Sequence, residues 1–342
     1  MAKSDVEDEY DFEDPPHVPL TLIEKKHLQD PRIVNQIETN MGQNLYAAVD
    51  FTLPFYLLSA WHGFIAIAHE TEHNGPLLLP EMQYSYAHLT LGDMHVSRKA
   101  KKRSKRYKLK LNSNLEGVLA GIDASHDSWI IPKYRDILRV LSRRAVKVPV
   151  AEANSEFRLY SVELYDAQTG ELAAGELGYT LGAVYTSLTG FVDRDRKADE
   201  AVAAQDAAKA EEPPPPETMQ VAPPDSSSST PTGPQVSATS LGRRPHDSAG
   251  TVQLVALGSL LKRCGYSFWN LGHPPKRATA TREGRMWYKA ELGARVLRRP
   301  VFLEKWKLAR SALPTNCELS AALPFEGMSA EALLVSDSGR SA

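Results

Sequence analysis

One glutamate in an otherwise apolar stretch is the first residue whose position calls for a chemical explanation. Glu176 lies within the run Leu172–Tyr179, between Gly175 and Gly178. An unpaired carboxylate is costly to bury, so this residue is paired, functional or on a solvated face of a strand. In a functional role it would accept a proton, and we take it as a candidate catalytic base.

Glu176 belongs to a predicted three-strand meander over residues 158–191, with turns at 166–170 and near Leu181-Gly182. Alternating apolar positions, β-branched residues and glycine-bearing turns all favour strands. Glycines inside such strands indicate bulges or the close approach of a ligand or another backbone. The candidate substrate-binding residues are Trp129, Tyr185, Ser187 and Trp269, although tryptophans of this kind are more often core residues.

Two further polar residues lie at the end of, or just after, a buried strand predicted at 266–271. Asn270 closes this strand, either as a satisfied core amide or as a hydrogen-bonding group of a pocket. His273 is a weaker candidate base. With Glu176, these residues complete the candidate catalytic set.

The segment His69–His73 fits the H-E-x-x-H pattern of zinc peptidases. That chemistry needs both histidines on one face of a helix, with the glutamate beside a zinc-bound water. The turn residues Asn74-Gly75-Pro76 follow at once, and Ile65 and Ile67 alternate as in a strand. We therefore predict no metal centre and rank a peptidase below the other functions.

A dense run of basic residues occupies positions 98–110. Helical spacing cannot place all of them on one face, so no part of the run is easily buried. One interpretation is a solvated charged face, and the other is an electrostatic footprint for the phosphate backbone of RNA or DNA. The candidate RNA-binding residues are Arg98, Lys99, Lys101, Lys102, Arg103, Lys105 and Arg106.

Composition narrows the class of protein. The chain has 342 residues and two cysteines, Cys264 and Cys317, so neither a disulfide framework nor a cysteine zinc site is expected. No secretory signal is visible, and the apolar run 51–68 is short for a membrane span, which favours a buried helix. We expect a cytoplasmic protein without a membrane partner and without a cofactor.

The pattern of elements predicts an α+β fold. Helices are expected at 114–122, 128–144, 251–264 and 287–292, with a closing helix from residue 300. The predicted organisation is a disordered acidic head at 1–16, a small N-terminal domain at 17–73, a larger domain at 74–193 and 250–313, a disordered Pro/Ser/Ala-rich insertion at 194–249, and a tail at 314–342.

Several blocks, in order, resemble the leucyl/phenylalanyl-tRNA–protein transferases. They are the segments 57–65 (LLSAWHGFI), 79–81 (LPE), 94–98 (MHVSR), 129–130 (WI), 160–164 (YSVEL), 170–175 (GELAAG), 292–294 (LGA), 298–299 (RR) and 302–303 (FL). They are spread over most of residues 51–193 and 250–306.

The resemblance implies an acetyltransferase-like (GNAT-type) mixed sheet with flanking helices behind a small N-terminal domain. It implies transfer of Leu, Phe or Met from aminoacyl-tRNA to the α-amine of an acceptor protein with a basic N-terminal residue, a tagging reaction of protein turnover. The basic helix would hold the acceptor stem, and Trp129 would help line the pocket for the aminoacyl end.

The chain also departs from the family at polar positions associated with the reaction. Asn270 stands where the family has an acid, Gly272 where it has an amide and Leu188 where it has a glutamate. Two functions therefore remain open: a transferase in which Glu176 supplies the carboxylate from a neighbouring strand, or an inactive homologue that binds tRNA or peptide.

Overall fold

The computed structural model describes residues 20–71, 75–125, 129–151, 153, 155–193, 248–275, 286–324 and 326–335. The predicted acidic head lies outside these ranges. So does the predicted insertion at 194–249, apart from residues 248–249, which stand at the start of a helix.

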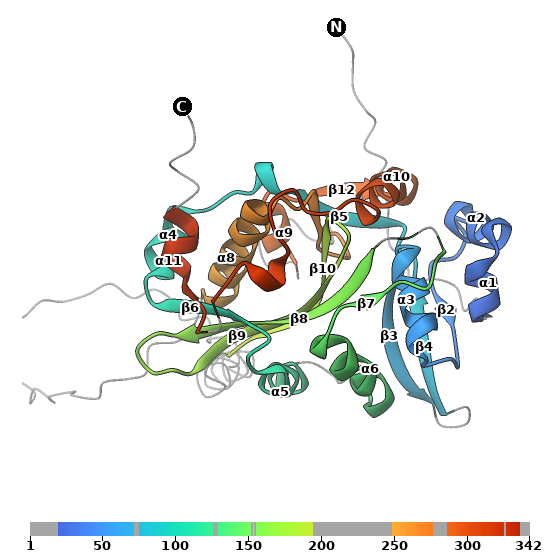
Figure 1. Ribbon diagram of the computed structural model, residues 1–342, viewed down its shortest axis with the longest axis horizontal. Helices are drawn as coiled ribbons and strands as arrows, with labels where there is room; N and C mark the ends of the chain where they lie inside the picture. Colours follow the sequence, from blue (N-terminus) through green and yellow to red (C-terminus); the bar gives the residue numbers. More distant parts are fainter. Residues whose placement is uncertain are drawn as a thin grey trace, which may run out of the picture.

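A large mixed sheet is the centre of the fold (Figure 1). Its strands run in the order β12-β5-β11-β10-β9-β8-β6-β13, and β7 also pairs with β8. Within this sheet, β10 and β11 pair in parallel and the other neighbours pair antiparallel. The bounds are β5 Ser85–Thr90, β6 Tyr107–Leu111, β7 Val146–Lys147, β8 Glu156–Asp166, β9 Leu172–Leu181, β10 Val184–Val192, β11 Phe268–Asn270, β12 Arg295–Arg298 and β13 Met328–Ser329.

The predicted meander is confirmed as β8, β9 and β10. Its turns use glycines in the left-handed region, Gly170 at φ 72° and Gly182 at φ 58°. A Cβ at Gly182 would also lie 2.2 Å from the carbonyl oxygen of Arg310, so this turn needs glycine for space as well. Successive side chains of these strands point to opposite faces of the sheet, and each face packs in a separate hydrophobic core.

Helices cover both faces of the sheet (Figure 1). One face, here called the α8 face, packs under α8 (Ala249–Cys264), α4 (Arg98–Ser104) and α11 (Ala330–Val335). The other, the α6 face, packs on α5 (Leu115–Ser125), α6 (Pro132–Arg143) and α3 (Leu53–Trp61). The fold is therefore α+β, as predicted.

A small N-terminal unit packs against one end of the sheet. It contains β1 (Thr21–Leu22), α1 (Lys25–Gln29), α2 (Pro31–Thr39), β2 (Tyr46–Ala47), α3, β3 (Ile65–Thr71) and β4 (Gly75–Glu81). Because β4 pairs with β3 along its whole length, this unit runs to Glu81 and does not end at residue 73. Turn residues mark a hairpin here as readily as they would mark a linker.

Arg299, at the start of α10 (Arg299–Arg310), joins this unit to the sheet. Its side chain is fully buried. The guanidinium donates hydrogen bonds to the backbone carbonyls of Ile37, Asn40, Gln43, Met82 and Gln83.

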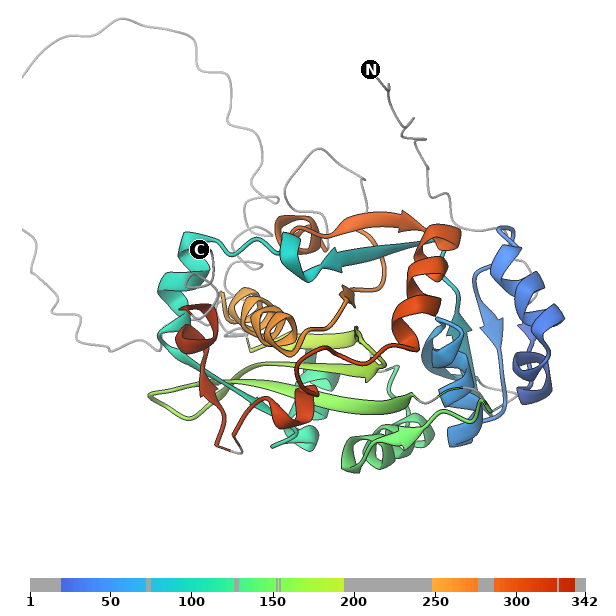
Figure 2. The same ribbon diagram turned by 45° about the horizontal axis from the view of Figure 1, so that its top comes forward.

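The described residues after 313 belong to the folded body, contrary to the predicted tail. They form a 3₁₀ turn at Leu319–Ala321, strand β13 and helix α11, and Figure 2 shows α11 in red beside α4. β13 pairs with β6, and Leu333 and Leu334 are buried in the core under α8. Helix α11 has only six residues, of which Ala330, Leu333 and Leu334 are buried, and a stretch this short does not establish a helical period in the sequence.

The two cysteines meet in the same region. Cys264 is buried, as expected of a small apolar residue, and its Sγ lies 3.3 Å from that of Cys317. Both are free thiols, and burial raises the pKa of Cys264 to about 12.

The apolar run 51–68 forms α3 and the start of β3, and α3 is largely buried as predicted. None of the helices in the described ranges has the length and hydropathy needed to cross a bilayer.

Candidate functional site

Four of the predicted site residues meet on the α8 face of the sheet. Ser187 Oγ donates to Glu176 Oε1 at 2.6 Å, and Tyr185 Oη donates to the same oxygen at 3.2 Å. Trp269 Nε1 in turn donates to Ser187 Oγ at 2.8 Å. Strand pairing explains the cluster, because β9, β10 and β11 are neighbours and these side chains share one face.

The environment of Glu176 changes its acid–base behaviour. Glu176 is 5% exposed, and burial raises its pKa to about 7. The hydrogen bonds from Ser187 and Tyr185 and the charge of Lys289 oppose that rise. A carboxyl group with this pKa can accept or release a proton near neutral pH.

Glycine and a strand irregularity make room for the cluster. A Cβ at Gly178 would lie 2.1 Å from Tyr185 Oη, so only glycine lets that hydroxyl pass across β9 to Glu176. The register of β10 against β9 shifts between Ser187 and Thr189. A glycine inside a strand was expected to allow the close approach of another group, and at Gly178 that group is the Tyr185 side chain.

Lys289 is a member of this site that sequence reasoning missed. It lies in the short helix α9 (Tyr288–Glu291) and is 5% exposed. Its Nζ donates to the carbonyl of His273 at 2.7 Å. Burial lowers the pKa of Lys289 to about 8, and the charge of Glu176 opposes this change. A lysine beside Trp287 and Tyr288 carries no sequence signal of burial, because lysines are usually exposed.

The other two candidate catalytic residues do not join Glu176. Asn270 follows Trp269 in the strand, so its side chain points to the α6 face, where Oδ1 accepts from the amide of Gly272 at 3.0 Å. The His273 side chain is largely exposed, and its Nε2 lies 2.8 Å from Glu81 Oε2. The predicted trio is therefore split between three surroundings.

Trp129 also lies away from Glu176. It packs with Tyr134 of α6, with ring centroids 5.7 Å apart, in the core of the α6 face. Leu188 lies on the same face and borders a crevice that has no room for a water molecule, together with Tyr56, Ile65 and Tyr179. Two positions that the resemblance assigns to the reaction are thus occupied by the fold itself: Leu188 is packed against the core, and Asn270 accepts a hydrogen bond from the nearby backbone.

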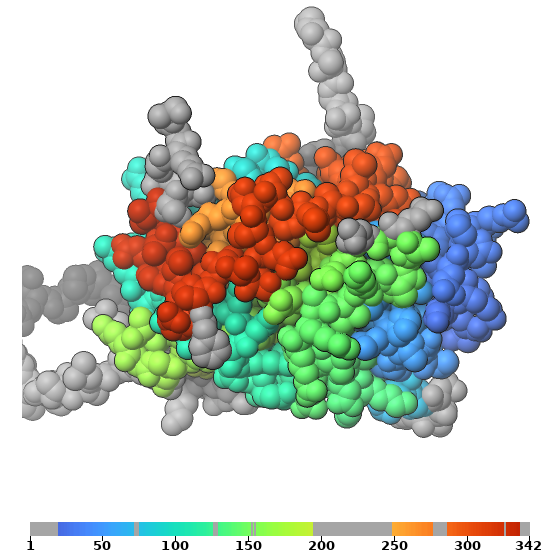
Figure 3. Space-filling model, viewed as in Figure 1, coloured from blue at the N-terminus to red at the C-terminus, as the bar shows by residue number. Residues whose placement is uncertain are grey.

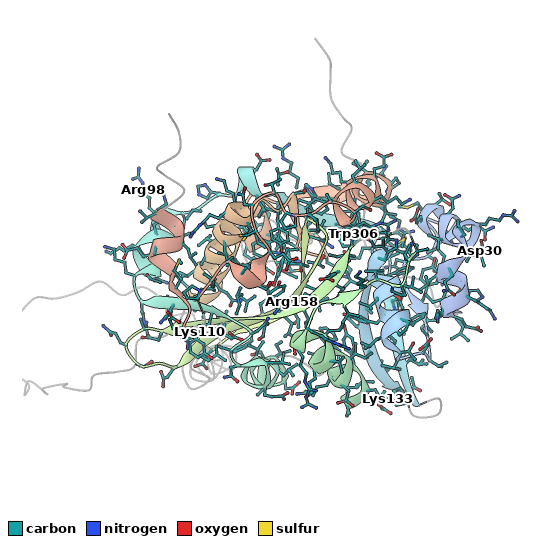
Figure 4. All side chains as sticks on the ribbon, in the orientation of Figure 1. Asp30, Arg98, Lys110, Lys133, Arg158 and Trp306 are labelled. Atoms are coloured by element: carbon teal, nitrogen blue, oxygen red, sulfur yellow. The ribbon has the colours of Figure 1, made fainter. Side chains whose placement is uncertain are left out.

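Helix α4 carries the predicted basic surface at the end of the molecule opposite the N-terminal unit (Figures 1 and 2). Ser97 caps it by accepting from Ala100 N, and buried Ala100 and Ser104 face the core. Its exposed cations with no hydrogen-bond or ion-pair partner among the described residues are Arg98, Lys99, Lys101 and Lys102. Figure 4 labels Arg98 at the outer edge of this end.

The other three predicted RNA-binding residues are engaged within the fold. Arg106 pairs with buried Asp166 at 2.5 Å, and Lys105 lies 3.4 Å from Glu331 of α11. Arg103 donates to Ser248 Oγ. Charge density alone did not distinguish these residues from the four unpartnered cations.

The H-E-x-x-H pattern does not form a helix in its described part. Residues 69–71 belong to strand β3, so consecutive side chains point to opposite sides, and His73 lies outside the described residues. Among the described residues, no group of three or more His, Cys, Asp or Glu side chains is placed to hold a metal ion.

Comparison of the chain with protein-family models and with curated proteins finds no match.

Proposed function

We propose that this protein binds tRNA through helix α4. The observation that carries the proposal is a set of exposed cations on two turns of one helix that have no side-chain partner within the described ranges: Arg98, Lys99, Lys101 and Lys102. Cations without protein partners are free to replace the counterions of a phosphate backbone. The resemblance to tRNA-dependent transferases, carried in part by this same segment, favours tRNA over other polyanions.

We also propose that the large domain is of the acetyltransferase (GNAT) type. This is supported by the mixed sheet, in which the parallel neighbours β10 and β11 are connected through α8. A helix that links two parallel strands must cross a face of their sheet, and α8 does so on the face that contains Glu176.

A single charge reversal on α4 tests the binding. Lys101→Glu is expected to weaken binding of labelled tRNA about tenfold at 0.1 M salt, because one phosphate contact becomes a repulsion. Lys133→Glu, on exposed Lys133 of α6, is the matched control and is expected to leave binding unchanged. Equal affinities of the two variants, measured by fluorescence anisotropy, would remove α4 as the tRNA site.

The second candidate function is transfer of the aminoacyl group to a protein N-terminus. It is favoured by the Glu176 carboxyl, which has a pKa of about 7 and lies on the same side of the sheet as α4. The acceptor α-amine would attack the ester carbonyl, and Glu176 would take the amine proton. The ester bond would then break, and the proton would return to the 3′ oxygen of the tRNA.

We rank binding without transfer above transfer because two positions that the resemblance assigns to the reaction, Leu188 and Asn270, lie on the α6 face and provide no space for substrates. There Leu188 borders a crevice without room for water, and Asn270 is held by Gly272. Aminolysis needs an amine and an ester held together, and these positions provide no such space.

Transfer of radiolabelled leucine or phenylalanine from charged tRNA to a model protein with N-terminal Arg separates the two functions. Incorporation that Glu176→Gln abolishes would establish the transferase. If tRNA binds in a salt-dependent way and no label is incorporated, the protein is a binder.

A further inference from the structure

A cavity of about 180 Å³ lies at the end of the meander away from α4. The start of β8 and the end of β9 form one wall, with Arg158, Tyr160 and Thr180 on the α8 face. The segment that follows α10, including Leu313 and Glu318, forms the opposite wall. Figure 3 shows the residues after α10, in red, lying across this side of the molecule.

The opposite wall is held in place by hydrogen bonds. Leu319 N donates to Tyr266 Oη at 3.2 Å, and Tyr266 itself lines the cavity. Asn316 N donates to the carbonyl of Cys264 at 3.0 Å, and Thr315 N donates to that of Gly265 at 3.2 Å. These hydrogen bonds attach the segment 315–319 to residues 264–266.

Arg158 is the unusual residue of this cavity. Its side chain is half-buried, and its Nε is fully buried without a hydrogen-bond partner among the described residues. Its guanidinium lies 5.6 Å from the ring centroid of Tyr160, and it makes no ion pair with any described residue. Arg310 also has a buried Nε without a partner among the described residues, but its Nη1 donates to the carbonyl of Trp61, whereas no hydrogen bond of the Arg158 guanidinium is found in the described part of the chain. The charge of Arg158 is therefore not neutralised by any described residue, and the part of its side chain that lines the cavity can pair with an anionic group of a ligand.

The cavity also carries negative charge. Glu156 and Glu318 line it, and both are exposed at its edge, whereas Tyr160 and Thr180 are buried deeper. A simple anion drawn to Arg158 would be repelled by these carboxylates. A ligand with one anionic and one cationic group satisfies both kinds of residue.

We propose that this cavity binds a small free α-amino acid. Its carboxylate pairs with Arg158, and its ammonium group faces Glu156 and Glu318. A volume of 180 Å³ equals about six water molecules, which fits a ligand the size of alanine or serine. The site is separate from Glu176 and α4 and does not rest on the proposed function.

Calorimetric titration of the full chain tests the proposal. L-alanine and L-serine are the probes, with acetate, inorganic phosphate and ethylamine as ligands that carry only one sign of charge. We expect saturable binding of an amino acid, at least about tenfold tighter than of the single-sign ligands. Arg158→Gln and Glu318→Gln should each weaken it about tenfold or more.

Arg143→Gln, at an exposed arginine at the end of α6, is the control and should bind as the unaltered chain does. Arg158→Gln removes no hydrogen bond or ion pair among the described residues, and Glu318 is exposed, so both variants should fold; thermal unfolding checks this. The proposal fails if no amino acid binds saturably, if acetate or phosphate binds as tightly, or if folded Arg158→Gln binds unchanged.

Discussion

Arg299 and helix α4 both present positive charge, yet the fold uses them in opposite ways. Arg299 is fully buried, and its guanidinium donates to five backbone carbonyls that join the N-terminal unit to the sheet. The cations of α4 (Arg98, Lys99, Lys101 and Lys102) are exposed and meet no acceptor in the described part of the chain. Changes at Arg299 should therefore affect stability, whereas changes on α4 should affect binding.

The largest effect on stability is expected at Arg299. Arg299→Gln would leave buried carbonyls without donors, and we expect a loss of about 4 kcal/mol in the free energy of unfolding. Urea denaturation measures this. The neighbouring Arg298→Gln is the control. A loss of less than about 1 kcal/mol in the free energy of unfolding for Arg299→Gln would show that the hydrogen bonds of Arg299 do not stabilise the fold.

Glu176 extends the comparison to a buried acid. Its folded pKa of about 7 lies above the ordinary 4.5, so the native state holds this proton more tightly than the unfolded state does. The stability linked to this proton is complete below pH 4.5 and is lost as the pH rises to about 7.

Across this window the unaltered protein should lose about 3 kcal/mol relative to Glu176→Gln. Denaturant unfolding at pH 4.5 and 7.5 checks it, with Glu304→Gln at an exposed position of α10 as control. A constant difference between the two proteins at both pH values would mean that Glu176 titrates normally.

An intermediate effect is expected at Arg106, which belongs to the basic run but pairs with an Asp166 side chain that is 2% exposed. Arg106→Gln removes the charged partner of a buried carboxylate, and the amides of Gln168 and Thr169 still donate to it. We expect a loss of about 2 kcal/mol.

Lys105→Gln, which breaks only the exposed pair with Glu331, should cost less than about 0.5 kcal/mol. If thermal unfolding shows that Arg106→Gln and Lys105→Gln lose the same stability, the buried pairing of Arg106 contributes no more than an exposed ion pair.

The smallest effect on stability is expected on α4 itself. Replacing Arg98, Lys99, Lys101 and Lys102 together by Gln should change the free energy of unfolding by less than about 0.5 kcal/mol, because these side chains have no partners to lose in the part of the chain that the structure describes. Calorimetry would show a near-normal melting temperature. A loss of several kcal/mol would instead make the charged face part of the fold.

Local patterns predicted the elements better than the contacts between them. The meander could be predicted because alternating apolar residues and glycine turns are local features that span only a few residues. The same alternation explains why the side chains of Trp269 and Asn270 point to opposite faces of the sheet. The burial of Lys289 was not predictable from its neighbours in the sequence, because it depends on tertiary packing, in which its Nζ donates to the carbonyl of His273. Helix α11 was not predicted because six residues are too few to establish a period, and its stability comes from packing against α8.

The most direct test of the central claim is the salt dependence of tRNA binding. The affinity of the full chain for tRNA is measured from about 50 to 300 mM salt, for the unaltered protein and for the variant with Gln at positions 98, 99, 101 and 102. A control replaces the same number of exposed basic residues on and after α6, Lys133, Arg143, Arg144 and Lys147.

We predict that the α4 variant lowers the magnitude of the log–log slope by about 3 to 4, since each released counterion contributes about 0.9. The control should keep the slope of the unaltered protein. Equal slopes and affinities for the α4 variant and the unaltered protein would contradict the proposal that this helix binds tRNA.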